Sequence, residues 1–229
     1  MSQADQKPAQ QKAKPFAQAV PSASASLKLR KQQVVRTALS AAAEELFLAR
    51  GFEKVTVEQI AQAAGVSRRT FFRYYESKED VMVERSDQFG EQLLTELAAR
   101  PLDEPPLLAI RNALVSAMQA SLAERDLVRY VIRSLRETSA LRRAIMEHRN
   151  RLEERIAALM ARRLGASSND NTPMLLAFVT RALHDTAVNA WYDNETDDIV
   201  GLVDDLVGRL CEIVAAMPVK SIKTRVSDQ

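Results

Sequence analysis

The feature that most restricts the fold is a short break, Gly65-Val66-Ser67, between two stretches with helical spacing. Thr56 and Gln59 have the spacing of a capping box at the start of the first stretch. Gly65 can adopt the left-handed backbone that ends a helix, and Ser67 is a good N-cap for the next one. Two short helices joined by so tight a turn predict a helix-turn-helix.

The second stretch, residues 68–75, holds three arginines and four aromatic rings, which helical geometry divides between two faces. Phe71 and Tyr75 are four residues apart and therefore share the inner face. The opposite face holds Arg69, Thr70, Arg73 and Tyr74. Guanidinium and hydroxyl groups on an exposed helix suit the guanine edges and phosphates of DNA. A plain helical corner with a solvated basic face would have the same pattern, so both interpretations stay open here.

Composition favours helices along the rest of the chain. Alanine and leucine dominate, and 229 residues include only six glycines and eight prolines. We find no alternating strand pattern, and the predicted fold class is all-α with about nine helices. The predicted helices span residues 29–50, 56–65, 67–75, 78–99, 104–124, 126–137, 139–165, 172–192 and 196–217.

Charge is distributed unevenly along the chain. Residues 1–27 carry a net +2, residues 28–80 carry +3, and residues 81–229 carry −3. The N-terminal residues are too polar to bury themselves. We therefore predict a disordered basic arm at 1–26, a helix-turn-helix domain at 27–76, a second helical domain at 77–217 and a C-terminal tail at 218–229.

The stretch "TVEQIAQAAGVSRRTFFRYYESKEDV", residues 56–81, resembles the signature of TetR-type transcriptional regulators. The matching features are a threonine at the start of the second helix, Ile-Ala, Ala-Gly-Val-Ser, an aromatic pair and Ser-Lys-Glu. Phe72 departs from the pattern, because the family usually has a phosphate-binding tyrosine there. Arg69 stands where a small residue is frequent. The DNA-binding positions expected from the motif and the resemblance are Thr56, Ser67, Arg68, Arg69, Thr70, Arg73, Tyr74 and Lys78.

Within this set, the resemblance implies phosphate contacts by Thr56, Thr70, Tyr74 and Lys78. It also implies a homodimer formed by the last two helices, which binds a double-stranded, pseudo-palindromic DNA operator and is released by a small-molecule effector. A monomeric helical core and a constitutive architectural DNA-binding protein without effector remain as alternatives.

The middle helices carry large apolar residues that would line an effector pocket in the domain at 77–217, so we expect a mostly apolar ligand. The expected pocket residues are Phe89, Leu93, Met118, Tyr130, Arg133, His184 and Trp191. Arg181 and Asp185 share a stripe with His184 and are further candidates for polar contacts.

Catalytic and metal-binding residues are scarce. The two histidines, His148 and His184, lack the spacing of helical metal sites, and no glycine-rich phosphate loop occurs. We therefore expect no enzymatic activity, no metal and no cofactor. The lone Cys211 fits a reducing compartment, and no apolar run is long enough to cross a bilayer. The expected location is the cytoplasm, without a membrane partner.

Overall fold

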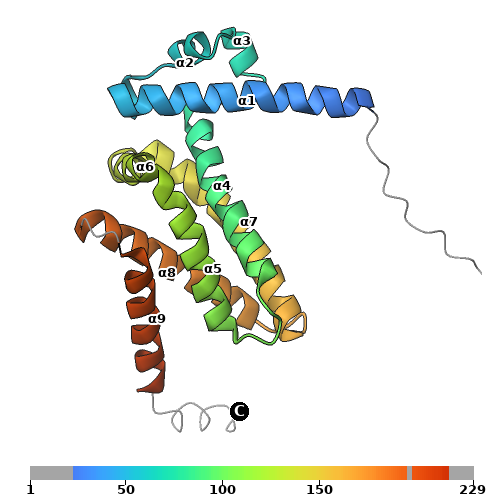
Figure 1. Cartoon of the computed structure of the whole chain (residues 1–229), viewed down its shortest axis with the longest axis vertical. Coiled ribbons are helices and arrows are strands. Elements are labelled where there is room, and N and C mark those ends of the chain that lie inside the picture. The colour runs from blue at the N-terminus through green and yellow to red at the C-terminus, as the bar shows by residue number, and fades with distance from the viewer. Residues whose placement is uncertain (1–22, 195–197, 217–229) are drawn as a thin grey trace, which may run out of the picture.

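The computed structural model describes residues 23–194 and 198–216, and these residues form helices joined by turns, without strands (Figure 1). The predicted all-α class is confirmed. Two single 3₁₀ turns, η1 (Phe52–Lys54) and η2 (Leu122–Glu124), interrupt the helical series. The α-helices are α1 (Ala23–Arg50), α2 (Val57–Ala63), α3 (Arg68–Phe71), α4 (Lys78–Ala99), α5 (Pro106–Ser121), α6 (Arg125–Glu137), α7 (Ser139–Leu164), α8 (Thr172–Asn194) and α9 (Ile199–Ala215).

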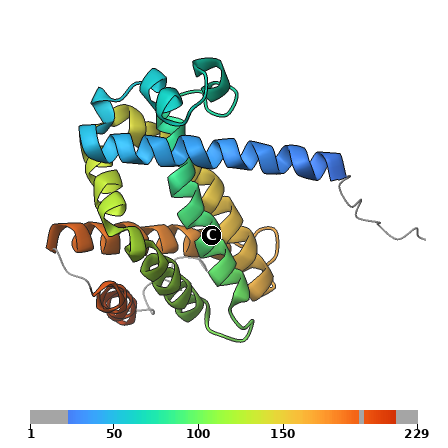
Figure 2. The same cartoon turned by 45° about the horizontal axis from the view of Figure 1, so that its top comes forward.

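The helices form a head and a body. α1 lies across one end of the molecule with α2 and α3 on its outer side, and these three helices make up the head (Figures 1 and 2). α4 leaves the head and runs through the body, where it packs against α5 and α7. α8 packs on α7, and α9 contacts α5 and α8 at the side of the body.

The local signals for helix ends are confirmed. Thr56 Oγ1 accepts a hydrogen bond from the amide of Gln59 at 3.3 Å, and the Gln59 side chain accepts one from the amide of Thr56 at 3.0 Å. Ser77 and Asp80 form the same box at the start of α4. Gly65 has a φ of 68°, which a residue with a Cβ rarely adopts, so the turn between α2 and α3 depends on this glycine.

Several helix boundaries differ from the sequence-based expectation, and α5 ends at Ser121 with the 3₁₀ turn η2 after it. α1 already begins at Ala23, because no breaker separates Pro21 from Gly51. α3 ends at Phe71 and continues as tighter turns, in which the amide of Tyr74 donates to the carbonyl of Phe71 at 2.8 Å. α5 begins at Pro106, since proline fits the first turn of a helix. α9 begins at Ile199, and the expected start at 196 lies outside the described residues. So do residues 1–22 of the expected arm and the tail at 218–229.

Head and body share one hydrophobic core. Phe71 is fully buried and Tyr75 is 3% exposed, and both pack in the same cluster as Met82 of α4. Tyr130 of α6 and Leu141 of α7 belong to this cluster as well. The head therefore rests on side chains of the body and is not a separately packed unit.

A partly buried polar contact joins the head to α4. The Glu84 carboxylate accepts a hydrogen bond from Arg36 Nε of α1 at 2.7 Å and another from the hydroxyl of Tyr75. The Arg36 guanidinium also lies 5.3 Å from the centre of the Tyr75 ring. Burial of the phenol, and then its hydrogen bond to Glu84 and the charge of that carboxylate, raise the pKa of Tyr75. Three segments of the chain thus meet at one carboxylate.

Replacing Tyr75 with phenylalanine should lower the free energy of unfolding by about 1.5–3 kcal/mol, because it removes a buried hydrogen bond to a charged group. Urea denaturation measures this loss, with Tyr192→Phe on α8 as the control.

The raised pKa of Tyr75 adds a pH dependence to the free energy of unfolding. Stability of the unmodified protein should fall as the pH rises above about 10, the ordinary pKa of tyrosine, and should fall less in Tyr75→Phe. Identical stability of the two proteins between about pH 8 and pH 11 would contradict the role of this hydrogen bond.

Candidate nucleic-acid interface and internal cavity

The outer face of α3 is basic and accessible. Arg68, Arg69 and Arg73 are exposed, whereas Phe71 and Tyr75 on the opposite side are buried. The predicted division into a core face and a solvent face holds for Phe71, Tyr75 and the arginines, whereas Tyr74, expected on the solvent face, packs partly against the core. The hydroxyl groups of Ser67 and Thr70 lie 2.9 Å apart at the start of the helix, and Ser67 also accepts the amide hydrogen of Thr70. Thr56 is exposed at the start of α2, and Tyr74 is half-buried.

The three arginines of α3 and of the turns that follow it differ in their contacts. Arg68 Nε lies 2.9 Å from a carboxylate oxygen of Glu58 on α2, and its guanidinium lies 5.4 Å from the centre of the exposed Phe72 ring. The Arg73 guanidinium lies 5.1 Å from the centre of its neighbouring Tyr74 ring. Arg69 has no carboxylate partner among the described residues. Arg69 is therefore the arginine of this face that is least engaged by the protein itself.

The structure gives Lys78 a different environment from the one the resemblance implies. Its Nζ donates to the carbonyl oxygens of Phe52 at 2.7 Å, Val55 at 3.1 Å and Glu53 at 3.4 Å. It also lies 4.5 Å from the centre of the Phe52 ring. An ammonium group has three hydrogens to donate, and the turn after α1 uses all three. Lys78 thus connects the start of α4 to the head.

A cavity of about 300 Å³, partly open to solvent, lies in the body, and helices α4 to α9 contribute to its wall. The wall is mostly apolar. The lining residues are Arg85, Ser86, Gln88, Phe89, Gln92, Met118, Ala120, Ser121, Leu122, Glu124, Val128, Val131, Ile132, Leu135, Ile145, Arg149, His184, Val188, Trp191 and Ile199. A cavity of this size and character suits a small apolar ligand.

The sequence identified part of this wall. Phe89, Met118, His184 and Trp191 line the cavity as expected. Three other expected residues do not. Leu93 packs in the core between α4 and α5, Tyr130 belongs to the core shared with the head, and the Arg133 guanidinium lies over the Tyr130 ring. Each of these helices presents one face to the cavity and another to the core, and periodicity does not say which face is which.

Polar groups cluster on one side of the cavity. The His184 ring lies 4.5 Å from the Phe89 ring, and its Nδ1 is 3.1 Å from Asp185. Arg149 of α7 donates to Asp185 at 2.9 Å. Burial alone would raise the pKa of Asp185, but the hydrogen bond to His184 and the charges of His184, Arg149 and Arg181 lower it on balance. Arg181 itself pairs with the buried Glu153 at 3.0 Å and does not line the cavity.

Neither a membrane span nor a metal site emerges from the part of the chain that the structure describes. No helix there combines the length and apolar character needed to cross a bilayer. Those residues also contain no group of three or more histidine, cysteine, aspartate or glutamate side chains placed to hold a metal ion.

Comparison with known proteins identifies the family. Residues 39–84 match the family model described as bacterial regulatory proteins, tetR family, and residues 104–215 match the MftR C-terminal domain. The HTH-type transcriptional regulator TcmR of Streptomyces glaucescens is 32% identical over 183 residues, which is 77% of this chain and 81% of TcmR. This chain belongs to the TetR family.

Other relatives of this TetR-family protein agree. MftR of Mycobacterium tuberculosis is 31% identical over 182 residues, covering 74% of this chain and 87% of MftR. A crystal structure of NalD, the secondary repressor of a multidrug efflux pump in Pseudomonas aeruginosa, aligns with a TM-score of 0.55 at 25% identity, covering 80% of this chain and 96% of NalD. A TetR-family structure from Syntrophomonas wolfei has a TM-score of 0.61 at 14% identity, covers 81% of this chain and 97% of its own, and supports the fold alone.

Replacing Lys78 with methionine tests the contacts of its ammonium group in this TetR-family protein. The change keeps the aliphatic stem and leaves three carbonyl oxygens without their donor, so it should lower the free energy of unfolding by about 1–3 kcal/mol. Urea denaturation measures the effect, and Lys54→Met, at an exposed lysine of η1, is the matched control. Unchanged stability, combined with a uniform loss of affinity for every DNA sequence, would instead indicate the phosphate contact that the resemblance implies.

Proposed function

We propose that this TetR-family regulator is a homodimeric repressor that leaves its operator when a small, mostly apolar ligand occupies the internal cavity. The observation that carries the proposal is the path of α4. This helix begins at the head contacts of Lys78 and Glu84. Further along, it contributes to the cavity wall Arg85, Ser86, Gln88, Phe89 and Gln92. One helix therefore touches both the ligand site and the DNA-binding head.

The exposed face of α3 is the DNA-reading surface in this proposal. Arg68, Arg69 and Arg73 supply guanidinium groups for base edges in the major groove. Thr56, Thr70 and Tyr74 supply hydroxyl groups for phosphates, and Ser67 orders the start of the helix. The two arginines that already stack on rings, Arg68 and Arg73, enter the groove partly ordered, which reduces the entropy lost on binding.

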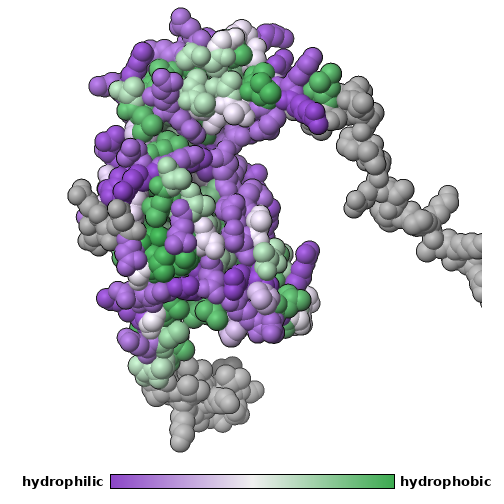
Figure 3. Space-filling view, viewed as in Figure 1, coloured by the Kyte–Doolittle hydropathy of each residue, from purple (hydrophilic) through white to green (hydrophobic). Residues whose placement is uncertain are grey.

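Exposed apolar residues on α8 and α9 support a dimer. Leu175 and Phe178 of α8 are 60% and 44% exposed, and Ile213 and Val214 of α9 are 64% and 58% exposed. Figure 3 shows hydrophobic residues at the surface near the lower end of α9. Gly208 has open space where a side chain would stand, which leaves room for a close helix contact. Two such helices from each subunit would bury these residues in a four-helix bundle.

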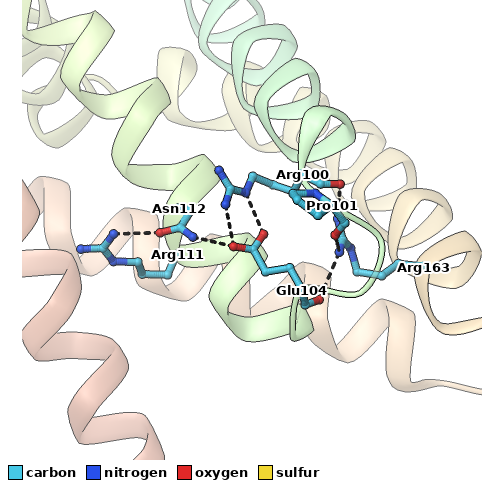
Figure 4. A network of polar contacts seen from close by, with 6 residues as sticks. All are labelled: Arg100, Pro101, Glu104, Arg111, Asn112 and Arg163. Atoms are coloured by element: carbon cyan, nitrogen blue, oxygen red, sulfur yellow. Dashed lines mark hydrogen bonds and ion pairs between the residues drawn. The ribbon is translucent and has the colours of Figure 1, made fainter.

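The far end of α4 is held firmly, which favours movement at the head. Arg100 forms two hydrogen bonds with Glu104, at 2.7 and 2.6 Å, and Asn112 of α5 donates to the same carboxylate (Figure 4). Arg163 of α7 donates to the carbonyl oxygens of Arg100 and Glu104, at 3.1 and 3.2 Å. A ligand that displaces the middle of α4 would therefore move the opposite end of this helix, which is joined to the head through Lys78 and Glu84.

The ligand must prefer the DNA-free arrangement. Switching operator occupancy from almost full to almost empty requires about a 10⁴-fold preference, or ~5.5 kcal/mol. A regulator of this kind works in the cytoplasm and needs no catalytic step, so the proposal includes neither an enzymatic activity nor a cofactor.

Selection of bound sequences from random DNA should return an inverted repeat whose half-sites are about one helical turn apart. Arg69→Ala should cost about 1–3 kcal/mol of binding and relax the preference at one base of each half-site. Binding should weaken steeply with salt.

Phe178→Asp, which places a charge on the exposed face of α8, should sediment as a monomer and lose the operator. A single unrepeated site, or tight binding by a monomer, would refute this function.

A screen of apolar metabolites should find compounds that raise the melting temperature and weaken operator binding together. Val188→Trp places an indole ring in the cavity wall, which reduces the space for a ligand, and should abolish both responses to such a compound. The control is Ala182→Ser, an exposed position on the same helix, which should respond like the unmodified protein. If Val188→Trp responds normally to every hit, the effector does not use this cavity. If no compound has any effect, a constitutive DNA-binding protein is the better description.

A further inference from the structure

A second hollow of about 210 Å³ lies between α4 and α7, directly beside the cavity. Its wall consists of Ser86, Asp87, Gly90, Glu91, His148, Arg149, Arg151, Leu152 and Arg155, and we call it the α4–α7 hollow. Ser86 and Arg149 line both the hollow and the cavity. The two spaces therefore adjoin each other where α4 and α7 meet, at Ser86 and Arg149.

α6 gives the cavity wall only the apolar residues Val128, Val131, Ile132 and Leu135. The two wall residues that the cavity shares with the hollow, Ser86 and Arg149, are polar. Arg85 and Glu124 also line the cavity, but they pair with each other. A ligand with one apolar end and one polar end would therefore place its polar end at Ser86 and Arg149. Its polar end would then point toward the hollow.

Both carboxylates of the hollow are already engaged. Glu91 accepts from Arg155, with one of the two hydrogen bonds at 2.8 Å, and these contacts lower the pKa of Glu91. Asp87 lies 3.1 Å from His148 Nδ1. Because the nearby carboxylates have cationic or N–H partners, the hollow offers little to attract a further cation.

Arg151, by contrast, retains unused donors. Its Nη2 lies 2.9 Å from His148 Nε2, and since a guanidinium group can only donate, Nε2 accepts and Nδ1 carries the hydrogen that faces Asp87. No ion pair between Arg151 and a carboxylate exists among the described residues. Arg149, on the side shared with the cavity, donates to Asp185 through Nη1.

We propose that the effector carries an anionic group, a carboxylate or a phosphate, which the α4–α7 hollow binds through Arg149 and Arg151 while the apolar part of the ligand fills the cavity. The inference rests on the proposed function, because it assumes that the cavity is the effector site. Planar guanidinium groups match the oxygens of either anion with paired, charge-assisted hydrogen bonds. An amphiphile bound in this way contacts α4 on two sides of the helix.

The test uses three ten-carbon probes that share an apolar chain: decanoate, decyl phosphate and 1-decanol. Trp191 is the only tryptophan of the chain and lines the cavity, so its fluorescence reports binding of each probe. At least one anionic probe should bind at least about tenfold tighter than decanol. The comparison of decanoate with decyl phosphate then identifies the preferred head group.

Arg151→Gln should remove this advantage while leaving the affinity for decanol unchanged. Arg151 is exposed, so the variant should keep the melting temperature of the unmodified protein. The matched control is Arg162→Gln, at an exposed arginine near the end of the same helix and outside both spaces, which should bind all three probes normally.

Several outcomes would overturn the inference. Equal affinity of decanol and both anionic probes would overturn it. So would an Arg151→Gln variant that still binds the anionic probe as much tighter than decanol as the unmodified protein does. A third such outcome is failure of inorganic phosphate at high concentration to compete with decyl phosphate. Binding by none of the three probes also overturns it. Selection of the operator and its release by other ligands are measured separately. The proposed repressor function can therefore hold even if the proposed anionic head group is refuted.

Discussion

The structure depends on how the start of α4 is fixed to the head. Glu84 accepts hydrogen bonds from Arg36 of α1 and from Tyr75 after α3, while Lys78 donates to three carbonyl oxygens of the turn after α1. Partly buried polar groups of this kind favour one geometry, because a lost partner leaves a poorly solvated charge or dipole. These contacts join the start of α4 to the segments on both sides of α3, and the proposed function uses them to connect α4 with the face that carries Arg69.

The local features of the head followed from the sequence because their causes are local. The capping box at Thr56, the left-handed Gly65 and the inward Phe71 each depend on residues within one or two turns. The contacts of Lys78 did not follow. Its long side chain reaches carbonyl groups more than twenty positions away in the chain, and helical spacing carries no information about such a contact. The sequence did not predict the Glu58–Arg68 ion pair for the same reason, since its partners lie on different helices.

The body was predictable in class and less so in detail. Helix number and approximate lengths followed from caps, glycine and proline, but the choice between cavity and core at each apolar position depends on how six helices pack. Phe89 and Leu93 illustrate this limit. They stand one turn apart on α4, yet Phe89 lines the cavity and Leu93 is buried in the core. Nothing in the sequence separates Arg149 from the other arginines of α7, and only the fold brings it to the boundary between the cavity and the α4–α7 hollow.

The shared core has a consequence for the evolution of such regulators. Met82, Tyr130, Leu141 and Ile145 of the body pack with the head residues Phe71 and Tyr75. A head transplanted from a distant relative would meet side chains of different shape, and poorly matched cores cost stability. New combinations of operator and effector specificity would therefore arise more readily by point substitution on exposed surfaces, such as the outer face of α3, than by recombination of whole heads with whole bodies. The continuous packing on which the proposed coupling relies also restricts the exchange of heads and bodies.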